Sequence, residues 1–136
     1  MSSVALDTSA AIPYIVRAHE AHARVSKRVS HRGPVLTGQS LAETYSVLTR
    51  LPSDARVAPE DAVRLLRNNF GNPVLLPDEL AIRLPEALAV ANIAGGAVYD
   101  ALVGLSAREA GILLVTRDRR AAGTYANLGV AYELVA

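Results

Sequence analysis

An uninterrupted apolar run, GILLVT at residues 111–116, is the feature that most constrains the fold of this chain. A strand that is apolar at every position is buried on both faces, which is typical of a parallel sheet covered by helices on both sides. Further candidate strands lie at residues 3–6, 35–37, within 71–77 and at 130–135. These runs together predict a mainly parallel central sheet.

Segments with helical features separate the candidate strands. We expect helices at residues 8–32 in two pieces around Pro13, at 40–51, 59–70, 78–91 with a bend at Pro85, 97–110 and 117–122. Proline suits the first turn of a helix and bends or ends a helix elsewhere. The alternation of strand and helix predicts a three-layer α/β/α sandwich. The length of 136 residues favours one domain spanning residues 1–136.

Composition excludes several classes of protein. The chain has no cysteine, which excludes a disulfide framework and thiolate metal sites. The most apolar stretch, residues 84–105, contains prolines, glycines and acids, and the N-terminus has no basic leader, so we expect a cytoplasmic protein without a membrane partner. A formal net charge of +1 neither requires nor excludes a nucleic-acid partner.

A purely structural role explains Asp100 less well than it explains the other acids. It lies inside a predicted helix, VYDALVGLSAREAG, and no residue one helical turn away is a cation. Aspartate has a low helix propensity, and burying its charge without a partner is costly. We therefore interpret Asp100 as a candidate ligand for a cation.

Three other acids occupy places where α/β proteins bind ligands. Asp7 follows the strand at 3–6, Glu43 starts the helix after the strand at 35–37, and Asp118 follows the strand at 111–116. The carboxyl ends of parallel strands lie at one edge of the sheet, where ligand sites form. Each acid also has a structural explanation: Asp7 and Asp118 as helix N-caps, and Glu43 in a capping box with Ser40. Both explanations are open at this point.

Clustered carboxylates indicate a divalent cation. They repel one another and raise each other's pKa, whereas a bound cation keeps all of them ionised. Oxygen ligands without cysteine or histidine suit Mg²⁺ or Mn²⁺, which activate water for attack on a phosphodiester. We expect this cofactor at Asp7, Glu43, Asp100 and Asp118.

Four stretches of the sequence resemble the acidic motifs of PIN-domain ribonucleases. They are VALDTSA, the AE of SLAETYSVLTRLP, YDALVGLSAREAG and LLVTRDRRA, in the order and spacing of that family. The size and the motif style are similar to VapC-type toxins of bacterial VapBC toxin–antitoxin pairs. The resemblance spans nearly the whole chain and implies a PIN-like fold.

The resemblance implies a metal-dependent endoribonuclease that hydrolyses RNA phosphodiesters. Its metal-binding and catalytic acids match Asp7, Glu43, Asp100 and Asp118, Thr116 matches a supporting hydroxyl, and Ser9 or Thr8 matches a position beside a metal-bound water. It also implies a homodimer and a cognate antitoxin that inserts into the acidic groove. The segment after Asp118 departs from the family, which often has another acid or an aromatic there, and leaves open whether Asp118 binds directly or through water.

Arginines beside Asp118 are the candidate RNA contacts. Arg117, Arg119 and Arg120 neighbour the predicted metal site, and arginine contacts to phosphate supply affinity without sequence choice. A second basic stretch at residues 17–32 is better interpreted as a solvated helix face.

Three alternatives to a nuclease depend on the same residues. A phosphoryl-receiving regulator needs an acidic neighbour for Asp7, and a haloacid-dehalogenase-like phosphatase needs an aspartate where this chain has Ser9. The remaining alternative is a non-catalytic PIN-fold module that binds an antitoxin or RNA without cleavage.

Overall fold

Four short parallel strands form the centre of the molecule. The structure is a computed structural model and describes residues 3–136. The strands are β1 (Val4–Leu6), β2 (Pro34–Leu36), β3 (Leu113–Thr116) and β4 (Tyr132–Leu134), in the sheet order β2-β1-β3-β4. Every neighbouring pair is parallel. Because β1 and β3 are the inner strands, the residues that follow them lie in the middle of the carboxyl edge.

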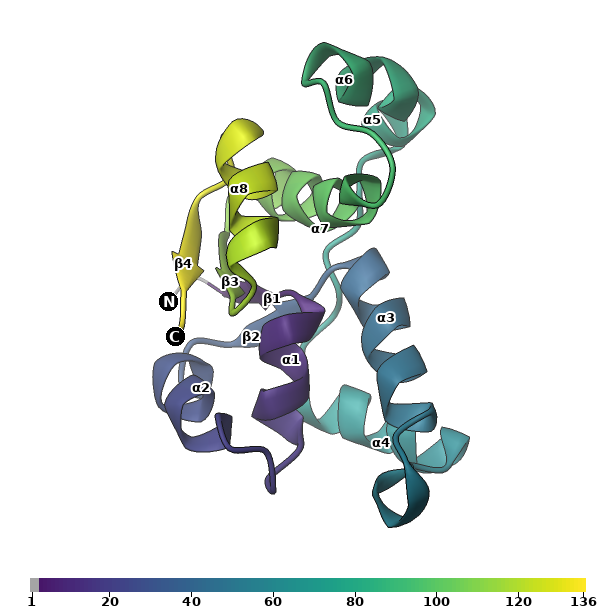
Figure 1. Cartoon of the computed structure of the whole chain (residues 1–136), viewed down its shortest axis with the longest axis vertical. Helices are drawn as coiled ribbons and strands as arrows, with labels where there is room; N and C mark the ends of the chain where they lie inside the picture. The colour runs from purple at the N-terminus through teal and green to yellow at the C-terminus, as the bar shows by residue number, and fades with distance from the viewer. Residues whose placement is uncertain (1–2) are drawn as a thin grey trace.

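Helices connect these strands and cover both faces of the sheet (Figure 1). Their bounds are α1 (Thr8–Ile15), α2 (His22–Val29), α3 (Gly38–Thr49), α4 (Pro59–Asn69), α5 (Asp78–Ile82), α6 (Leu84–Val90), α7 (Ala97–Ala110) and α8 (Arg119–Asn127), with a short 3₁₀ turn at Ser53–Ala55. The α5–α6 pair lies at one end, away from the sheet (Figure 1). Within residues 3–136 no helix has the length and apolar character needed to cross a membrane.

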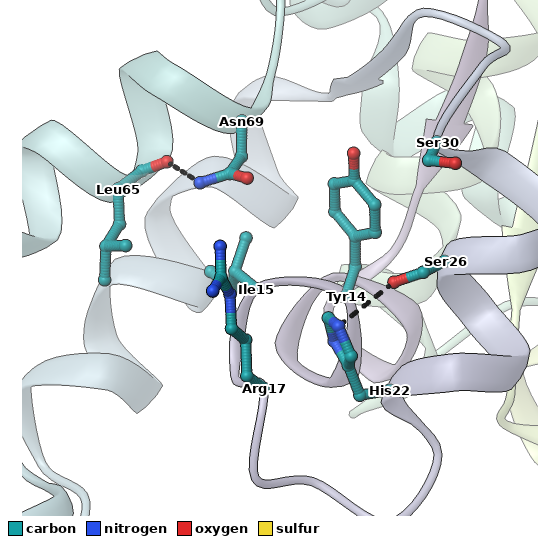
Figure 2. A pocket seen from close by; sticks show the side chains of 8 residues that line it. All are labelled: Tyr14, Ile15, Arg17, His22, Ser26, Ser30, Leu65 and Asn69. Carbon is teal, nitrogen blue, oxygen red and sulfur yellow. Dashed lines mark hydrogen bonds between the residues drawn. The ribbon is translucent and has the colours of Figure 1, made fainter.

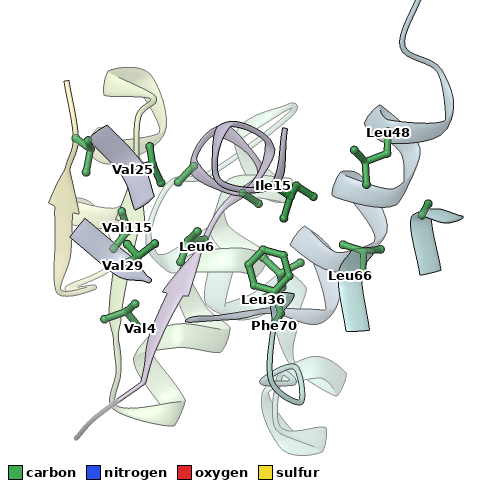
Figure 3. Packing of buried hydrophobic residues seen from close by; sticks show 14 residues of the cluster. Val4, Leu6, Ile15, Val25, Val29, Leu36, Leu48, Leu66, Phe70 and Val115 are labelled. Atoms are coloured by element: carbon green, nitrogen blue, oxygen red, sulfur yellow. The ribbon is translucent and has the colours of Figure 1, made fainter. Parts of the chain in front are cut away.

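Alternate strand residues point into two separate hydrophobic layers. Val4, Leu6 and Val115 pack with residues of α1, α2 and α4, and Figure 3 shows Val25 and Val29 of α2 close to them. Ala5 and Leu114 point the other way, into a layer built with α7 and α8. Successive side chains of a strand alternate between faces, so two covered faces require an apolar residue at every position. The expected α/β/α sandwich with a parallel sheet is confirmed.

The expected strand within residues 71–77 is wrong. Among the described residues this segment contributes one isolated bridge, between Val74 and Thr37. Pro73 and Pro77 on either side of Val74 and Leu75 have no backbone N–H to donate to a neighbouring strand. The segment therefore touches the edge of the sheet without extending it.

Several expected helix boundaries also differ, two of them near the predicted acids. The first helical region does form two helices, but the break lies at residues 16–21 and Pro13 is inside α1. Proline removes only one backbone donor, and the short helix continues past it. The helix expected at 117–122 begins at Arg119 and continues to Asn127 as α8, so it includes a position, Tyr125, that the sequence prediction left outside.

The capping box expected for Ser40 and Glu43 is wrong. Helix α3 begins at Gly38, and its capping box joins Thr37 to Ser40. The Thr37 backbone N–H donates to Ser40 Oγ over 2.8 Å, and the Ser40 N–H donates to Thr37 Oγ1 over 3.0 Å. Glu43 therefore lies beyond the first turn of α3 and is not engaged in capping it.

Candidate metal and RNA site

Asp7 lies at the centre of the carboxyl edge of the sheet. It follows Leu6, which is in register with Leu36 of β2 and Val115 of β3. Its backbone N–H donates to the Val115 carbonyl over 3.2 Å, and its side chain is only 6% exposed. It also caps α1, because Oδ1 accepts a hydrogen bond from the Ala10 N–H. The capping explanation is therefore right for Asp7, but a cap does not require such deep burial.

Hydroxyl groups hold both oxygens of the Asp7 carboxylate. Ser9 Oγ donates to Oδ1 over 2.6 Å, and the Tyr125 hydroxyl donates to Oδ2 over 2.8 Å. Burial raises the pKa of Asp7, and hydrogen bonds, with that from Ser9 first, oppose the rise. Among the contacts found in residues 3–136, no ion pair joins Asp7 to a basic side chain. The charge is held by neutral donors, which leaves it attractive to a cation.

Asp100 is repelled by the other three predicted acids. It is half-buried in the first turn of α7. Burial raises its pKa most, repulsion from Asp118, Asp7 and Glu43 raises it further, and Arg120 lowers it. Acids of three other segments therefore act electrostatically on Asp100.

Glu43 and Asp118 differ in how far the protein engages them. Glu43 Oε1 accepts one hydrogen bond, from Thr8 Oγ1 over 3.2 Å. Asp118 caps α8 by accepting from the backbone N–H of Arg120 and of Ala121, and Asp118 Oδ2 lies 3.4 Å from Arg120 Nη2. The capping explanation is thus right for Asp118 as well, and its second oxygen already has a cationic neighbour.

Thr116 and Ser9 tie the loop after β3 to the loop after β1. Thr116 is fully buried, its Oγ1 accepts from the Asp118 N–H over 3.1 Å, and it lies 3.3 Å from Ser9 Oγ. Ser9 Oγ in turn accepts from the Arg117 N–H over 2.8 Å. These two hydroxyls fix the backbone that carries Asp118 relative to the backbone that carries Asp7.

The donor set of this site fits a hard divalent cation. All four side chains offer carboxylate oxygens, and the repulsion of Asp100 by the other three is the kind that a cation relieves. In residues 3–136, no three acidic or histidine side chains stand close enough to form a ready metal site. Holding an ion would therefore require the carboxylates to move toward one another.

The three candidate RNA-binding arginines have different surroundings. Arg117 is half-buried, and its Nε has no hydrogen-bond partner among residues 3–136. Arg119 is exposed, and Arg120 is exposed beside Asp118. In the other basic stretch, Arg28 and Arg32 pair with Glu133 of β4, which supports its interpretation as an ordinary surface face.

A cavity of about 460 Å³ at the far end of α1 is separate from these acids. It is lined by residues of α1, α2 and α4 and of the loop after α1, among them Tyr14, Arg17 and His22 (Figure 2). Figure 2 shows Ser26 beside His22, with Ser26 Oγ 3.4 Å from His22 Nε2. None of the four acids lines this cavity, so it does not belong to the candidate metal site.

Sequence reasoning missed Tyr125. Its side chain is completely buried, and its hydroxyl contacts a carboxylate 118 positions away in the sequence. It lies in the stretch AAGTYANLGV, where no motif indicates a polar contact. Only the packing of α8 against the sheet reveals it.

Comparison with known proteins gives the family. The PIN-domain profile matches residues 4–127. The chain is 55% identical over 127 residues to Ribonuclease VapC27 of Mycobacterium tuberculosis, covering 93% of each chain. It is 42% identical over 133 residues to Ribonuclease VapC40 of the same species, covering 97% of this chain and 98% of the relative.

Solved structures of low sequence identity share the fold. VapBC2 from Rickettsia felis, solved bound to a DNA fragment from the promoter, matches with a TM-score of 0.69 at 12% identity, over 98% of this chain and 99% of that one. VapC20 of Mycobacterium tuberculosis, described as a sarcin–ricin loop cleaving toxin, matches with a TM-score of 0.63 at 21% identity, over 88% and 93%. The four acids lie within the residues matched by the profile. The two relatives named as ribonucleases align with almost the whole chain. The chain therefore belongs to the PIN-domain family, among the VapC-type ribonucleases.

Proposed function

We propose that this protein is the toxin of a type II toxin–antitoxin pair and that it cleaves RNA internally in a reaction dependent on Mg²⁺ or Mn²⁺. The observation that carries the proposal is the Asp100 carboxylate, which is repelled by acids of three other segments, in a chain 55% identical to a ribonuclease. A structural role leaves that repulsion unexplained, because each acid could be replaced by a neutral residue at lower electrostatic cost.

Asp7, Glu43, Asp100 and Asp118 are the side chains that would hold the cation. A bound Mg²⁺ or Mn²⁺ supplies charge that polarises a phosphoryl oxygen and activates water. The chain's own hydroxyls orient the acids: Ser9 holds Asp7, Thr8 holds Glu43, and Thr116 holds the backbone of Asp118. An acidic site by itself would repel phosphate, so the arginines nearby have to attract the RNA backbone.

The proposed partners are RNA, a cognate antitoxin and a second copy of the chain. Membership in the VapC-type ribonucleases supports the RNA substrate and the antitoxin. The related structure from Rickettsia felis contains a VapBC pair, which supports the same assembly for this chain. RNA as substrate in turn supports the cytoplasm as the place of action.

We expect cleavage of single-stranded RNA to require Mg²⁺ or Mn²⁺ and to stop in EDTA. The cation should also stabilise the folded protein, by about 2.7 kcal/mol when its concentration is 100 times its Kd. Gel assays with each ion and thermal unfolding with and without Mn²⁺ test both effects. Cleavage that continues in EDTA would show the metal assignment to be wrong. Absence of cleavage with every ion would favour the non-catalytic binding module.

We expect Arg119→Ala to weaken RNA binding about equally for all sequences, because phosphate contacts carry no base information. Each lost phosphate contact should lower the slope of log affinity against log salt by about 0.7 for a single strand. Fluorescence anisotropy with a labelled RNA, at several salt concentrations and without divalent ions, measures the slope. Arg64→Ala is the matched control, because Arg64 lies on α4 and pairs with Asp61. An unchanged slope for Arg119→Ala would remove this residue from the RNA site.

A further inference from the structure

Tyr125 is a buried polar side chain to which the proposed chemistry gives no role. We propose that Tyr125 is a positioning residue that orients the Asp7 carboxylate for cation binding. The inference rests on the proposed function, in which Asp7 is a metal ligand. It is carried by the 2.8 Å hydrogen bond from the Tyr125 hydroxyl to Asp7 Oδ2 and by the complete burial of Tyr125.

The tyrosine ring is fixed in place by tight packing. A Cβ atom added at Gly104 would lie 2.9 Å from Tyr125 Cδ1 and 3.2 Å from Val130 Cγ2, distances too short to tolerate without movement. The ring of Tyr132 lies near it as well, with 6.3 Å between ring centroids. Gly104 is one turn after Asp100 on α7. The ring therefore packs against the helix that carries Asp100 while its hydroxyl holds Asp7.

The hydroxyl can act only as a donor toward Asp7. The phenol carries an O–H group, and an ionised carboxylate offers only acceptor oxygens, so the 2.8 Å contact is donated by Tyr125. Ser9 Oγ and the Ala10 N–H donate to the other oxygen, Oδ1. Since separate donors hold the two oxygens, rotating the carboxylate would break at least one hydrogen bond. The orientation of Asp7 is thereby fixed before any cation arrives.

A purely structural role explains this arrangement poorly. Burying a hydroxyl and a carboxylate together removes both from water, and an apolar pair in the same core would avoid that loss. Metal-binding side chains, by contrast, are commonly oriented by hydrogen bonds from neighbouring residues, and losing such a partner typically lowers metal affinity or activity 10–100-fold. The Tyr125 hydroxyl is such a hydrogen-bond partner for Asp7.

The test compares Tyr125→Phe with Tyr132→Phe. Each substitution removes one hydroxyl and keeps the ring, but Tyr132 is 39% exposed and is not part of the site. Mn²⁺ binding by isothermal titration calorimetry, RNA cleavage and thermal unfolding are measured on the full chain. We expect Tyr125→Phe to raise the Kd for Mn²⁺ about 10-fold or more and to lower cleavage comparably. Tyr132→Phe should keep the wild-type Kd and activity.

The possible failures are distinguishable. If the wild type binds Mn²⁺ and folded Tyr125→Phe binds it equally well, the Tyr125 proposal is wrong and the proposed function stands. If the wild type binds no Mn²⁺, the metal-dependent function itself is wrong, and the role of Tyr125 falls with it.

A second measurement applies if Tyr125→Phe does not fold. The wild-type chain, which has five tyrosines, is labelled with 3-fluorotyrosine and titrated with Mg²⁺ by ¹⁹F NMR. Phe variants of the other four tyrosines identify the Tyr125 resonance by elimination. We expect that resonance to shift as Mg²⁺ binds. A Tyr125 resonance that stays unchanged while calorimetry records Mg²⁺ binding would overturn the proposal.

Discussion

Asp7→Asn is expected to lower RNA cleavage by more than about 10²-fold, the upper end of the loss caused by removing a hydrogen-bond partner of a metal ligand. The substitution keeps the size of the side chain and an oxygen that can cap α1, since Asn caps helices about as well as Asp. It removes the charge that a cation would bind. Activity should therefore be lost without loss of the fold.

The same substitution should make the metal-free protein more stable at neutral pH. Burial raises the pKa of Asp7 in the folded state above its unfolded value, so folding favours the protonated form. The resulting stability is fully present below the unfolded pKa of about 3.9 and is lost as the pH rises through the folded pKa. Asn is neutral throughout, so its advantage over Asp should be present at pH 7 and should shrink as the pH falls toward 4.

Asp61→Asn is the matched control for both measurements. Asp61 lies on α4, its side chain is 55% exposed, and it pairs with Arg64 at the surface. Such pairs contribute about 0–1 kcal/mol, so cleavage should be unchanged and stability nearly so. Gel-based cleavage in Mn²⁺ and urea unfolding in EDTA across the pH range measure the two properties. A folded Asp7→Asn variant that cleaves at the wild-type rate would remove Asp7 from the site.

Leu114→Ala is expected to lower the free energy of unfolding by about 2–5 kcal/mol. Leu114 is completely buried on β3, an inner strand, and points into the layer formed with α7 and α8. Both of its neighbouring strands are held by hydrogen bonds, so the space left by the smaller side chain closes only in part. A loss of this size is a large share of the usual total stability of about 5–15 kcal/mol.

Leu75→Ala is the control for the core substitution. Leu75 is 67% exposed, and a change at such a surface position is usually within about 0.5 kcal/mol. Urea unfolding followed by circular dichroism gives both values. If the two substitutions had equal effects, β3 would not be the two-sided core strand described above.

The sequence predicted the parts of the fold that depend on local pattern. The fully apolar run of β3 indicated a strand buried on both faces, and both hydrophobic layers are present. The prediction within residues 71–77 failed because apolar character alone does not make a strand. Pro73 and Pro77 limit the backbone donors there, and only one bridge forms.

The sequence also predicted a group of four acids, and it left their individual roles open. Asp7 and Asp118 prove to be helix caps as well as members of the acidic group, so the two explanations are compatible. For Glu43 the capping explanation fails, because Thr37 and Ser40 cap α3 instead. The expected and the observed capping box differ by three positions and look equally suitable in the sequence, so only the observed start of the helix decides between them.

By itself, then, the sequence determined the alternating architecture, the carboxyl edge at which Asp7 and Asp118 lie, and the family that the motifs resemble. The architecture and the edge follow from hydrophobic periodicity and from the alternation of strand and helix, and the family follows from the resemblance of the four motifs. Only the tertiary structure decided that Tyr125 holds Asp7 and that Thr8 holds Glu43. Those contacts join residues far apart in the chain, and their geometry depends on how helices pack on the sheet, which no local pattern encodes.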